Sequence, residues 1–141
     1  MIEGVTIRRV TATDTKLFDR IATDVFDEPV IPARLAAYLD TPGHLMIVAI
    51  KDDEIVGQTA AVVHRHPDKV SELYIDEVGV TPALHRQGIA RRMLAEMLVW
   101  GKELGCGESW VGTETDNVPA RGLYEGFGAH AQLFVMYEMD L

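Results

Sequence analysis

The segment from residue 71 to residue 104 constrains the fold of this chain more than any other. It begins as an apolar strand, turns through a short loop, and continues as a long helical pattern that Gly105 ends. The expected buried stripe of the helix consists of Ile89, Met93, Met97 and Leu104. A buried strand that leads directly into an amphipathic helix predicts helices packed on a sheet.

Strand and helix patterns alternate along the rest of the chain. Thr11 and Asp14 match a capping pattern and are expected to open a helix that extends to Phe26. A polar turn at Asp52 and Asp53 predicts an antiparallel hairpin. The expected order is strand 5–10, helices 14–26 and 33–39, strands 45–50, 55–64 and 71–80, helix 88–104, strand 109–113, helix 119–127 and strand 132–139. The fold class is therefore α/β (α+β), with a mixed central sheet flanked by helices in a single domain over residues 1–141.

Charge and cysteine usage narrow the function. The net charge is −9, from 22 acidic and 13 basic residues, which argues against nonspecific nucleic-acid binding. Such a charge would attract a cationic partner, although solubility alone explains it equally well. No apolar run approaches the roughly 20 residues that span a bilayer, so no membrane partner is expected. With Cys106 as the only cysteine and no secretory start, we expect a cytoplasmic protein.

The loop before the long helix has the features of an anion-binding turn. A helix start offers free N–H groups and a partial positive charge, and phosphates bind there. Gly88 would let an anion approach the backbone closely. The alternative is an ordinary strand-to-helix turn that contains a glycine. The segment matches neither the P-loop nor the dinucleotide-binding glycine pattern, which leaves a different class of pyrophosphate site.

Two motifs give this loop a resemblance. Residues 85–90 are similar to the acetyl-CoA motif Arg/Gln-x-x-Gly-x-Gly/Ala of GNAT acetyltransferases, with His85 as a departure at its first position. A second motif of that family, Asn-x-x-Ala-x-x-Leu-Tyr-x-x-x-Gly, is matched by Asn117, Ala120, Leu123, Tyr124 and Gly128. The resemblance implies a GNAT fold and acetyl-CoA as cofactor, and it covers nearly the whole chain.

The resemblance also implies where the cofactor binds. In the family the strand before the loop carries a bulge and splays from its neighbour, which here places a gap between residues 77–80 and 110–113. The N–H of Val78 is expected to polarise the acetyl carbonyl. The implied cofactor-binding residues are Val78, Gly79, Val80, His85, Arg86, Gln87, Gly88, Ile89, Ala90, Arg91, Asn117 and Tyr124.

Acetyl transfer to an amine needs a base, since an amine with a pKa near ~10 is mostly protonated at neutral pH. Glu77 is the favoured base and Asp76 the alternative, because side chains alternate along a strand and only one should face the cleft. Tyr124 matches the family's general acid, which would protonate the leaving thiolate. A solvated acid at Glu77 and a packing tyrosine at Tyr124 are the structural alternatives.

The substrate follows from a closer resemblance, to the GNAT-type aminoglycoside 3-N-acetyltransferases that confer gentamicin and fortimicin resistance. The similar stretches are residues 24–28, 72–77, 85–90 and 134–140. A polycationic drug calls for carboxylates around the cleft. The expected substrate-binding residues are Asp27, Glu28, Asp76, Glu77, Glu114, Asp116 and Glu138, with Asp140 as a further candidate. The alternatives are a GNAT enzyme for a polyamine, a small amine or a protein N-terminus, and a non-catalytic acetyl-CoA-binding module.

Three further features of the sequence give little support for a functional role. Cys106 lies between glycines with no histidine nearby in the sequence, so we interpret it as an incidental thiol rather than a nucleophile. His64 and His66 alternate as metal ligands on a strand can, but no further His/Cys cluster supports a metal site. The strand expected at 132–139 would leave an edge through which a homodimer could form.

Overall fold

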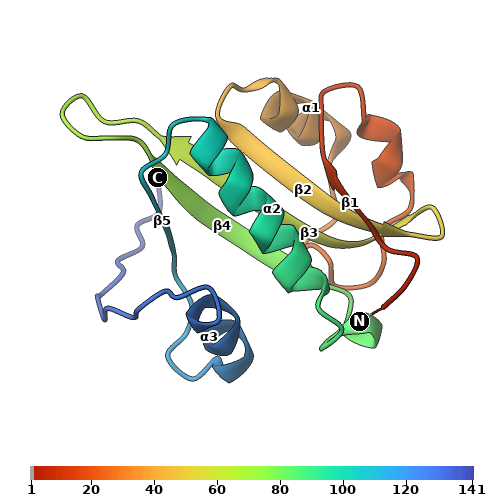
Figure 1. Cartoon of the computed structure of the whole chain (residues 1–141). Helices are drawn as coiled ribbons and strands as arrows, with labels where there is room; N and C mark the ends of the chain where they lie inside the picture. The colour runs from red at the N-terminus through yellow and green to blue at the C-terminus, as the bar shows by residue number, and fades with distance from the viewer. Residues whose placement is uncertain (1) are drawn as a thin grey trace.

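One five-stranded sheet organises the protein, and the computed structural model describes residues 2–141 (Figure 1). The strands lie side by side in chain order, from β1 to β5. They are β1 Thr6–Arg9, β2 His44–Lys51, β3 Glu54–His64, β4 Glu72–Val80 and β5 Glu108–Val111. Neighbouring strands are antiparallel except β4 and β5, which are parallel. The mixed sheet and the β2–β3 hairpin are therefore confirmed.

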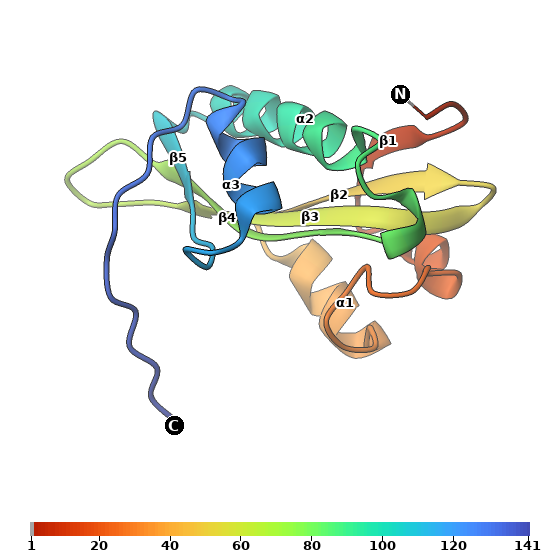
Figure 2. The same ribbon diagram turned by 90° about the horizontal axis from the view of Figure 1, so that it is seen from below.

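Helices cover both faces of the sheet (Figure 2). The long helix α2, Ile89–Glu103, and the shorter α3, Val118–Glu125, lie on one face. On the other face lie α1, Pro32–Asp40, and a 3-10 turn at Thr15–Asp19. We refer to these as the α2 face and the α1 face. The helix-on-sheet layers expected from the sequence are confirmed.

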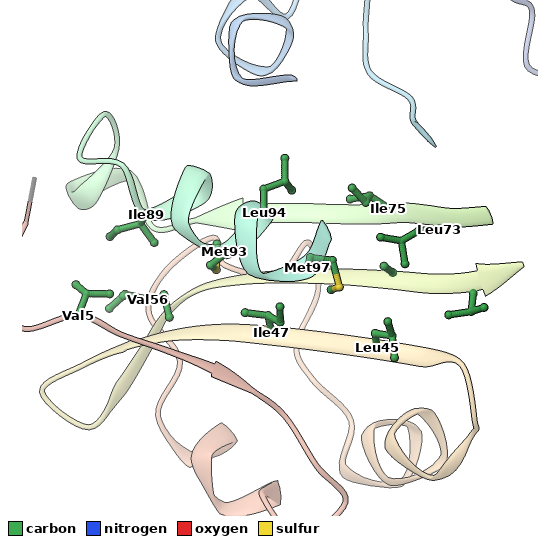
Figure 3. Packing of buried hydrophobic residues seen from close by; sticks show 13 residues of the cluster. Val5, Leu45, Ile47, Val56, Leu73, Ile75, Ile89, Met93, Leu94 and Met97 are labelled. Carbon is green, nitrogen blue, oxygen red and sulfur yellow. The ribbon is translucent and has the colours of Figure 1, made fainter. Parts of the chain in front are cut away.

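Helix α2 forms the main core against strands β2, β3 and β4 (Figure 3). Ile89, Met93 and Met97 are fully buried, as their spacing predicts. Leu104, expected on the same stripe, is 44% exposed, and Gly101 takes the buried position instead. A Cβ on Gly101 would lie 2.7 Å from a methyl carbon of Leu73, so glycine lets the helix approach β4 closely.

The helix expected at 14–26 is wrong. The capping pattern exists, because the Thr11 N–H donates to the Asp14 carboxylate at 2.8 Å, but only the 3-10 turn follows. The chain then pairs with β3: the N–H of Ile55 donates to the carbonyl of Arg20, and the N–H of Ala22 donates to the carbonyl of Ile55. This pairing buries the apolar side chains of the segment and satisfies its backbone, so tertiary contacts override the helical spacing.

The strand expected at 132–139 is also wrong for the single chain. No strand is present there, and every residue from 131 to 141 is exposed. The segment lies on the β5 side of the molecule and extends away from the sheet (Figure 2).

Candidate active site

A bulge interrupts β4 at the position where the site begins. Ala60 pairs with Glu77 and Ala61 pairs with Ile75, so Asp76 has no partner on β3. Two side chains contact the backbone around this irregularity: the Tyr38 hydroxyl lies 3.2 Å from the Ala61 carbonyl oxygen, and Thr59 Oγ1 donates to the Glu77 carbonyl at 2.8 Å. The bulge is therefore held in place by the side chains packed around it.

Strand β4 separates from β5 just beyond this point. The two strands pair from Glu72 to Ile75 on β4 and from Glu108 to Val111 on β5, and the pairing stops there. Residues 76–80 therefore have no strand partner on the β5 side within residues 2–141. The expected gap is present, but it begins after Val111 rather than at Trp110, because Trp110 still pairs with Tyr74.

The start of α2 lies beside the end of this gap. Gly88 caps the helix with φ of +82°, and Arg86 also has a positive φ of +62°. Within residues 2–141, the N–H groups of 87–91 donate to no carbonyl and to no side chain. A run of free N–H groups at an uncapped helix start is a ready site for an anion such as a diphosphate.

Two basic side chains near this loop contact other parts of the protein. His85, at the motif position where Arg or Gln is usual, places Nε2 2.7 Å from the Val80 carbonyl oxygen, so the side chain braces the loop against β4. The Arg91 guanidinium lies 5.0 Å from the ring centre of Phe127 and links α2 to the segment after α3. His85 therefore shapes the loop, while the backbone N–H groups of the loop remain open.

Helix α3 carries Tyr124 to the same region. Asn117 caps the helix, its side-chain oxygen accepting from the Ala120 N–H at 3.1 Å. Leu123, Tyr124 and Phe127 pack against the α2-face core. Burial raises the pKa of the Tyr124 hydroxyl, so at neutral pH it remains protonated and able to donate. The contact expected between Asn117 and the cofactor remains a prediction.

An acidic cleft opens on the opposite face, between α1 and the bulge. Its volume is about 650 Å³. Its charged lining consists of four carboxylates, Asp27, Glu28, Asp76 and Glu77, and the guanidinium of Arg34. The expectation that only one of Asp76 and Glu77 faces the cleft is wrong, because the unpaired residue of the bulge breaks the strand alternation. Both acids therefore belong to one site.

Glu77 has the electrostatics of a base. It is half-buried, and burial raises the pKa of its carboxyl group, with the charges of Asp27 and Asp76 adding to the effect. Gln58, which is buried, places Nε2 3.4 Å from Glu77 Oε1 and partly opposes that rise. A carboxylate with a raised pKa binds a proton more readily than an ordinary surface acid.

Comparison with known proteins assigns this architecture. The family model described as the acetyltransferase (GNAT) family matches residues 15–129. The chain belongs to the GNAT family. The N-alpha-acetyltransferase RimI of Mycobacterium tuberculosis (strain ATCC 25618 / H37Rv) is 29% identical over 128 residues, which cover 89% of this chain and 78% of RimI. The cofactor of the GNAT chain is accordingly acetyl-CoA, as expected.

Solved structures of aminoglycoside acetyltransferases share the GNAT fold. One is meta-AAC0020 from an uncultured soil metagenomic sample, in complex with trehalose; it has a TM-score of 0.83 and 20% identity, covering 98% of this chain and 97% of that one. Another is AAC(6')-Iy in complex with a bisubstrate analogue, with a TM-score of 0.79 and 19% identity, covering 97% of this chain and 98% of that one. At these identities the likeness shows the fold.

Two residues of the GNAT site were missed by sequence reasoning. Gln58 lies in the apolar run of β3, and a lone amide in such a run is the one signal that could have singled it out. Tyr38 lines the cleft, and its hydroxyl donates to the Leu45 carbonyl at 2.7 Å. Burial and the charges of Asp76 and Glu77 raise the pKa of Tyr38. Nothing in the local sequence distinguishes this tyrosine from a packing residue of α1.

The remaining predicted acids do not line this cleft. Glu114 and Asp116 lie on the exposed loop between β5 and α3. Glu138 and Asp140 lie in the exposed C-terminal segment. These four acids are therefore not among the residues that line the cleft, and their role in substrate binding remains a prediction.

Cys106, His64 and His66 lie outside the cleft and the loop before α2. Burial raises the pKa of Cys106, which keeps it protonated and disfavours a nucleophilic role. His66 contacts the carboxylate of Glu72, and its ring lies 4.3 Å from that of His64. Among residues 2–141, no cluster of His, Cys, Asp and Glu could hold a metal ion. In the same range, no helix has both the length and the apolar character needed to cross a membrane.

Proposed function

We propose that this GNAT enzyme acetylates an amine of an aminoglycoside. The observation that carries the proposal is the acidic cleft, whose four carboxylates surround the bulge of β4. Ammonium and hydroxyl groups bind strongly to carboxylates, and an aminoglycoside presents several of both. The net charge of −9 would also steer a polycation toward the protein. Loss of a drug ammonium group by acetylation would serve as antibiotic resistance.

Within that proposal, the 3-amino group is the acetylated position favoured by the sequence. Its support is the resemblance of residues 24–28 and 72–77 to the 3-N-acetyltransferases. AAC(6')-Iy, in contrast, is a 6'-type enzyme and shares the fold at 19% identity. Identification of the acetylated nitrogen in the product therefore decides between the two positions.

The two substrates are proposed to enter from different sides of the sheet. The free N–H groups at 87–91 would hold the diphosphate of acetyl-CoA, and the unpaired edge at 76–80 would bind its arm. The cleft that would hold the amine lies on the α1 face. The gap between β4 and β5 is proposed to join the two sides, so that the amine and the acyl group would meet beside Glu77.

Proton transfer is assigned to two side chains. Acetyl-CoA supplies an acetyl thioester, and the new C–N bond forms as the C–S bond breaks. Glu77 accepts the proton that the amine must lose, directly or through water, because its raised pKa suits it to that role. Tyr124 donates its hydroxyl proton to the leaving thiolate from the α2 face. The Val78 N–H is proposed to polarise the acetyl carbonyl.

A protein N-terminus is the second candidate substrate. The identity of 29% to RimI, an N-alpha-acetyltransferase, over 89% of the chain favours it. A peptide enzyme needs an open groove with backbone partners, whereas a drug enzyme needs several spaced acids. The four clustered carboxylates favour the drug, and for that reason we place the peptide second.

A substrate panel tests the proposal. We expect acetyl-CoA-dependent release of CoA with gentamicin-like or kanamycin-like drugs, and little release with spermidine or with a peptide bearing a free N-terminus. Mass spectrometry and NMR of the product identify the acetylated nitrogen. Turnover confined to the peptide would transfer the proposal to N-terminal acetylation, and CoA binding without turnover on any amine would leave only a binding module.

The electrostatics of the cleft predict a pH effect. The Asp27 charge helps to raise the pKa of Glu77, so Asp27→Asn should move the acidic limb of kcat/KM to lower pH. The limb should move to lower pH because Glu77 can accept a proton only in its ionised form, and a lower pKa keeps Glu77 ionised at lower pH. Asp53→Asn, in the β2–β3 turn, is the matched control and should leave the limb in place. An unmoved limb in Asp27→Asn would contradict the assignment.

A further inference from the structure

Two aromatic side chains stack on each other beside the acidic cleft. Tyr74 of β4 and Trp110 of β5 are partners in the parallel pairing of the two strands. Their ring centres lie 4.2 Å apart, and the rings are inclined by 25°. Tyr74 is partly exposed and Trp110 is 43% exposed. We call this pair the aromatic shelf. Exposed aromatic surface with a defined orientation is a feature of binding sites, because its contact with water is unfavourable.

The aromatic shelf lies on the same face of the sheet as the cleft. Leu73 and Ile75 are buried in the core under α2, so Tyr74 between them points to the α1 face. Val111 also packs on the α2 side, which directs its neighbour Trp110 to the α1 face as well. Helix α1 packs on β2 and β3 and does not extend over β5 (Figure 2). The shelf is therefore left open by the helix that forms one wall of the cleft.

Asp76 connects the aromatic shelf to the cleft. It lines the cleft and follows Tyr74 by two residues, a distance of roughly 7 Å along a strand. Burial and the nearby charge of Asp76 raise the pKa of the Tyr74 hydroxyl, so this hydroxyl stays protonated beside the carboxylate. A ligand that fills the cleft and is longer than one sugar ring would therefore extend over the two aromatic rings.

An aromatic surface beside carboxylates has the chemistry of a site for an amino sugar. A sugar ring has an apolar face of C–H groups that packs on an aromatic ring, and its ammonium groups are attracted to the face of a tryptophan more than to that of any other side chain. The acids of the cleft add to this attraction for a cation. A linear polyamine has the charge but no ring to stack, so the combination favours a cationic ligand of several rings.

We propose that the aromatic shelf of Tyr74 and Trp110 binds a second ring of the aminoglycoside, while the ring that carries the reacting amine occupies the cleft. This inference rests on the proposed function and adds to it the residues that would select multi-ring drugs over single-ring amines. Tyr74 and Trp110 would touch the substrate away from the reacting nitrogen. They should therefore affect KM for the drug and leave kcat nearly unchanged.

Tryptophan fluorescence tests whether a drug reaches the aromatic shelf. Trp100 and Trp110 are the two tryptophans of the chain, so Trp100→Phe leaves Trp110 as the single emitter. We expect saturating kanamycin to change the emission of Trp110, and 2-deoxystreptamine, a single-ring amine, to change it little. Trp110→Phe is the matched control, because Trp100 lies on α2 beside Arg9 and should not respond. Unchanged Trp110 emission while calorimetry shows bound kanamycin would overturn the proposal.

Kinetics distinguish a binding role from a structural one. Trp110→Ala should raise KM for kanamycin by about 3- to 30-fold, the range of an ammonium-to-tryptophan contact, with kcat and KM for acetyl-CoA little changed. The affinity for 2-deoxystreptamine, measured as substrate or as competitive inhibitor, should stay as in the native chain. Trp110→Phe keeps an aromatic face and should retain most of the affinity for kanamycin.

Two outcomes separate failure of the aromatic shelf from failure of the proposed function. If kanamycin is acetylated equally well by the native chain and by Trp110→Ala, or if that variant weakens both amines by the same factor, the shelf has no role in drug binding and the proposed function stands. If no aminoglycoside binds or is acetylated by the native chain, the proposed function fails and the inference fails with it. A circular dichroism spectrum confirms that each variant is folded.

Discussion

Replacement of Glu77 by Gln is expected to lower turnover of the acetylated amine by about 10²- to 10⁴-fold, the usual contribution of a positioned general base. The amide keeps the size of the side chain and its neighbours, but it cannot accept a proton. Because Glu77 lines the cleft on the α1 face, while the free N–H groups at 87–91 lie at the start of α2, binding of acetyl-CoA should change little. Steady-state kinetics and calorimetric titration with CoA measure the two effects separately.

Stability provides an internal check on this variant. Burial and the charges of Asp27 and Asp76 raise the pKa of Glu77 in the folded state, so its ionised form is disfavoured by folding. The folded state is therefore relatively favoured at acid pH, and this advantage is lost as the pH rises through the folded pKa. Removal of the charge by Glu77→Gln should raise Tm modestly at neutral pH, and the gain should vanish in acid. Loss of activity in a better-folded protein excludes unfolding as its cause.

The matched control is Glu3→Gln, which makes the same chemical change at an exposed position near the N-terminus. It should leave kcat, KM and Tm as they are in the native chain. If Glu77→Gln turned over like this control, Glu77 would have no part in proton transfer, and Asp76, on the same side of the bulge, would become the candidate base.

The parts of the fold that the sequence predicts correctly are those in which local pattern and tertiary packing agree. Helix α2 has an uninterrupted apolar stripe and a glycine at each end, and its observed bounds fall within a residue of those expected. The β2–β3 hairpin follows from two apolar runs separated by Asp52 and Asp53, both of which adopt positive φ in the turn. In these elements no distant contact competes with the local preference.

The two wrong elements are those whose fate depends on distant partners. The segment after Asp14 has helical spacing, yet its backbone pairs with Ile55 of β3, more than thirty residues away. The C-terminal segment, residues 131–141, has strand spacing, yet it pairs with no strand and all of its residues are exposed. In the first segment the apolar pattern correctly indicates burial, but the backbone geometry is set by contact with β3, which the local pattern does not encode.

The candidate site likewise has parts that local sequence predicts and parts that depend on contacts between distant residues. The motif residues around Gly88 lie at the start of a helix, as the sequence predicts, because a helix start is a feature of local backbone. The cleft was predicted less well: its four acids come from the α1 face, and the bulge turns Asp76 to the same side as Glu77. Gln58, which contacts Glu77, comes from β3 and was missed. Side chains that meet only through sheet register have no signature along the chain.

Gly79→Ala is expected to have the largest effect on stability, at a position predicted from the motif to serve the cofactor. A Cβ on Gly79 would lie 2.3 Å from the Val25 carbonyl oxygen, a backbone atom that cannot turn aside. The same oxygen accepts from Gln58 Nε2 at 3.3 Å. Overpacking costs about 1–3 kcal/mol and loss of a buried hydrogen bond about 1 kcal/mol, so the free energy of unfolding should fall by roughly 3 kcal/mol. Chemical denaturation with urea measures it.

Gly79→Ala should also affect function, because relief of the clash requires the structure around it to move. Relief of the clash must move the segment around Val25 away from β4, and the next residues of that segment, Asp27 and Glu28, line the cleft. We therefore expect KM for the amine to rise more than KM for acetyl-CoA. Gly122→Ala is the matched control, since nothing lies within 4 Å of a Cβ at that helical position, and it should be neutral or stabilising by about 0.5–1 kcal/mol. If Gly79→Ala and Gly122→Ala were equally stable, the close contact between the Val25 carbonyl and Gly79 of β4 would not determine the position of the segment that lines the cleft.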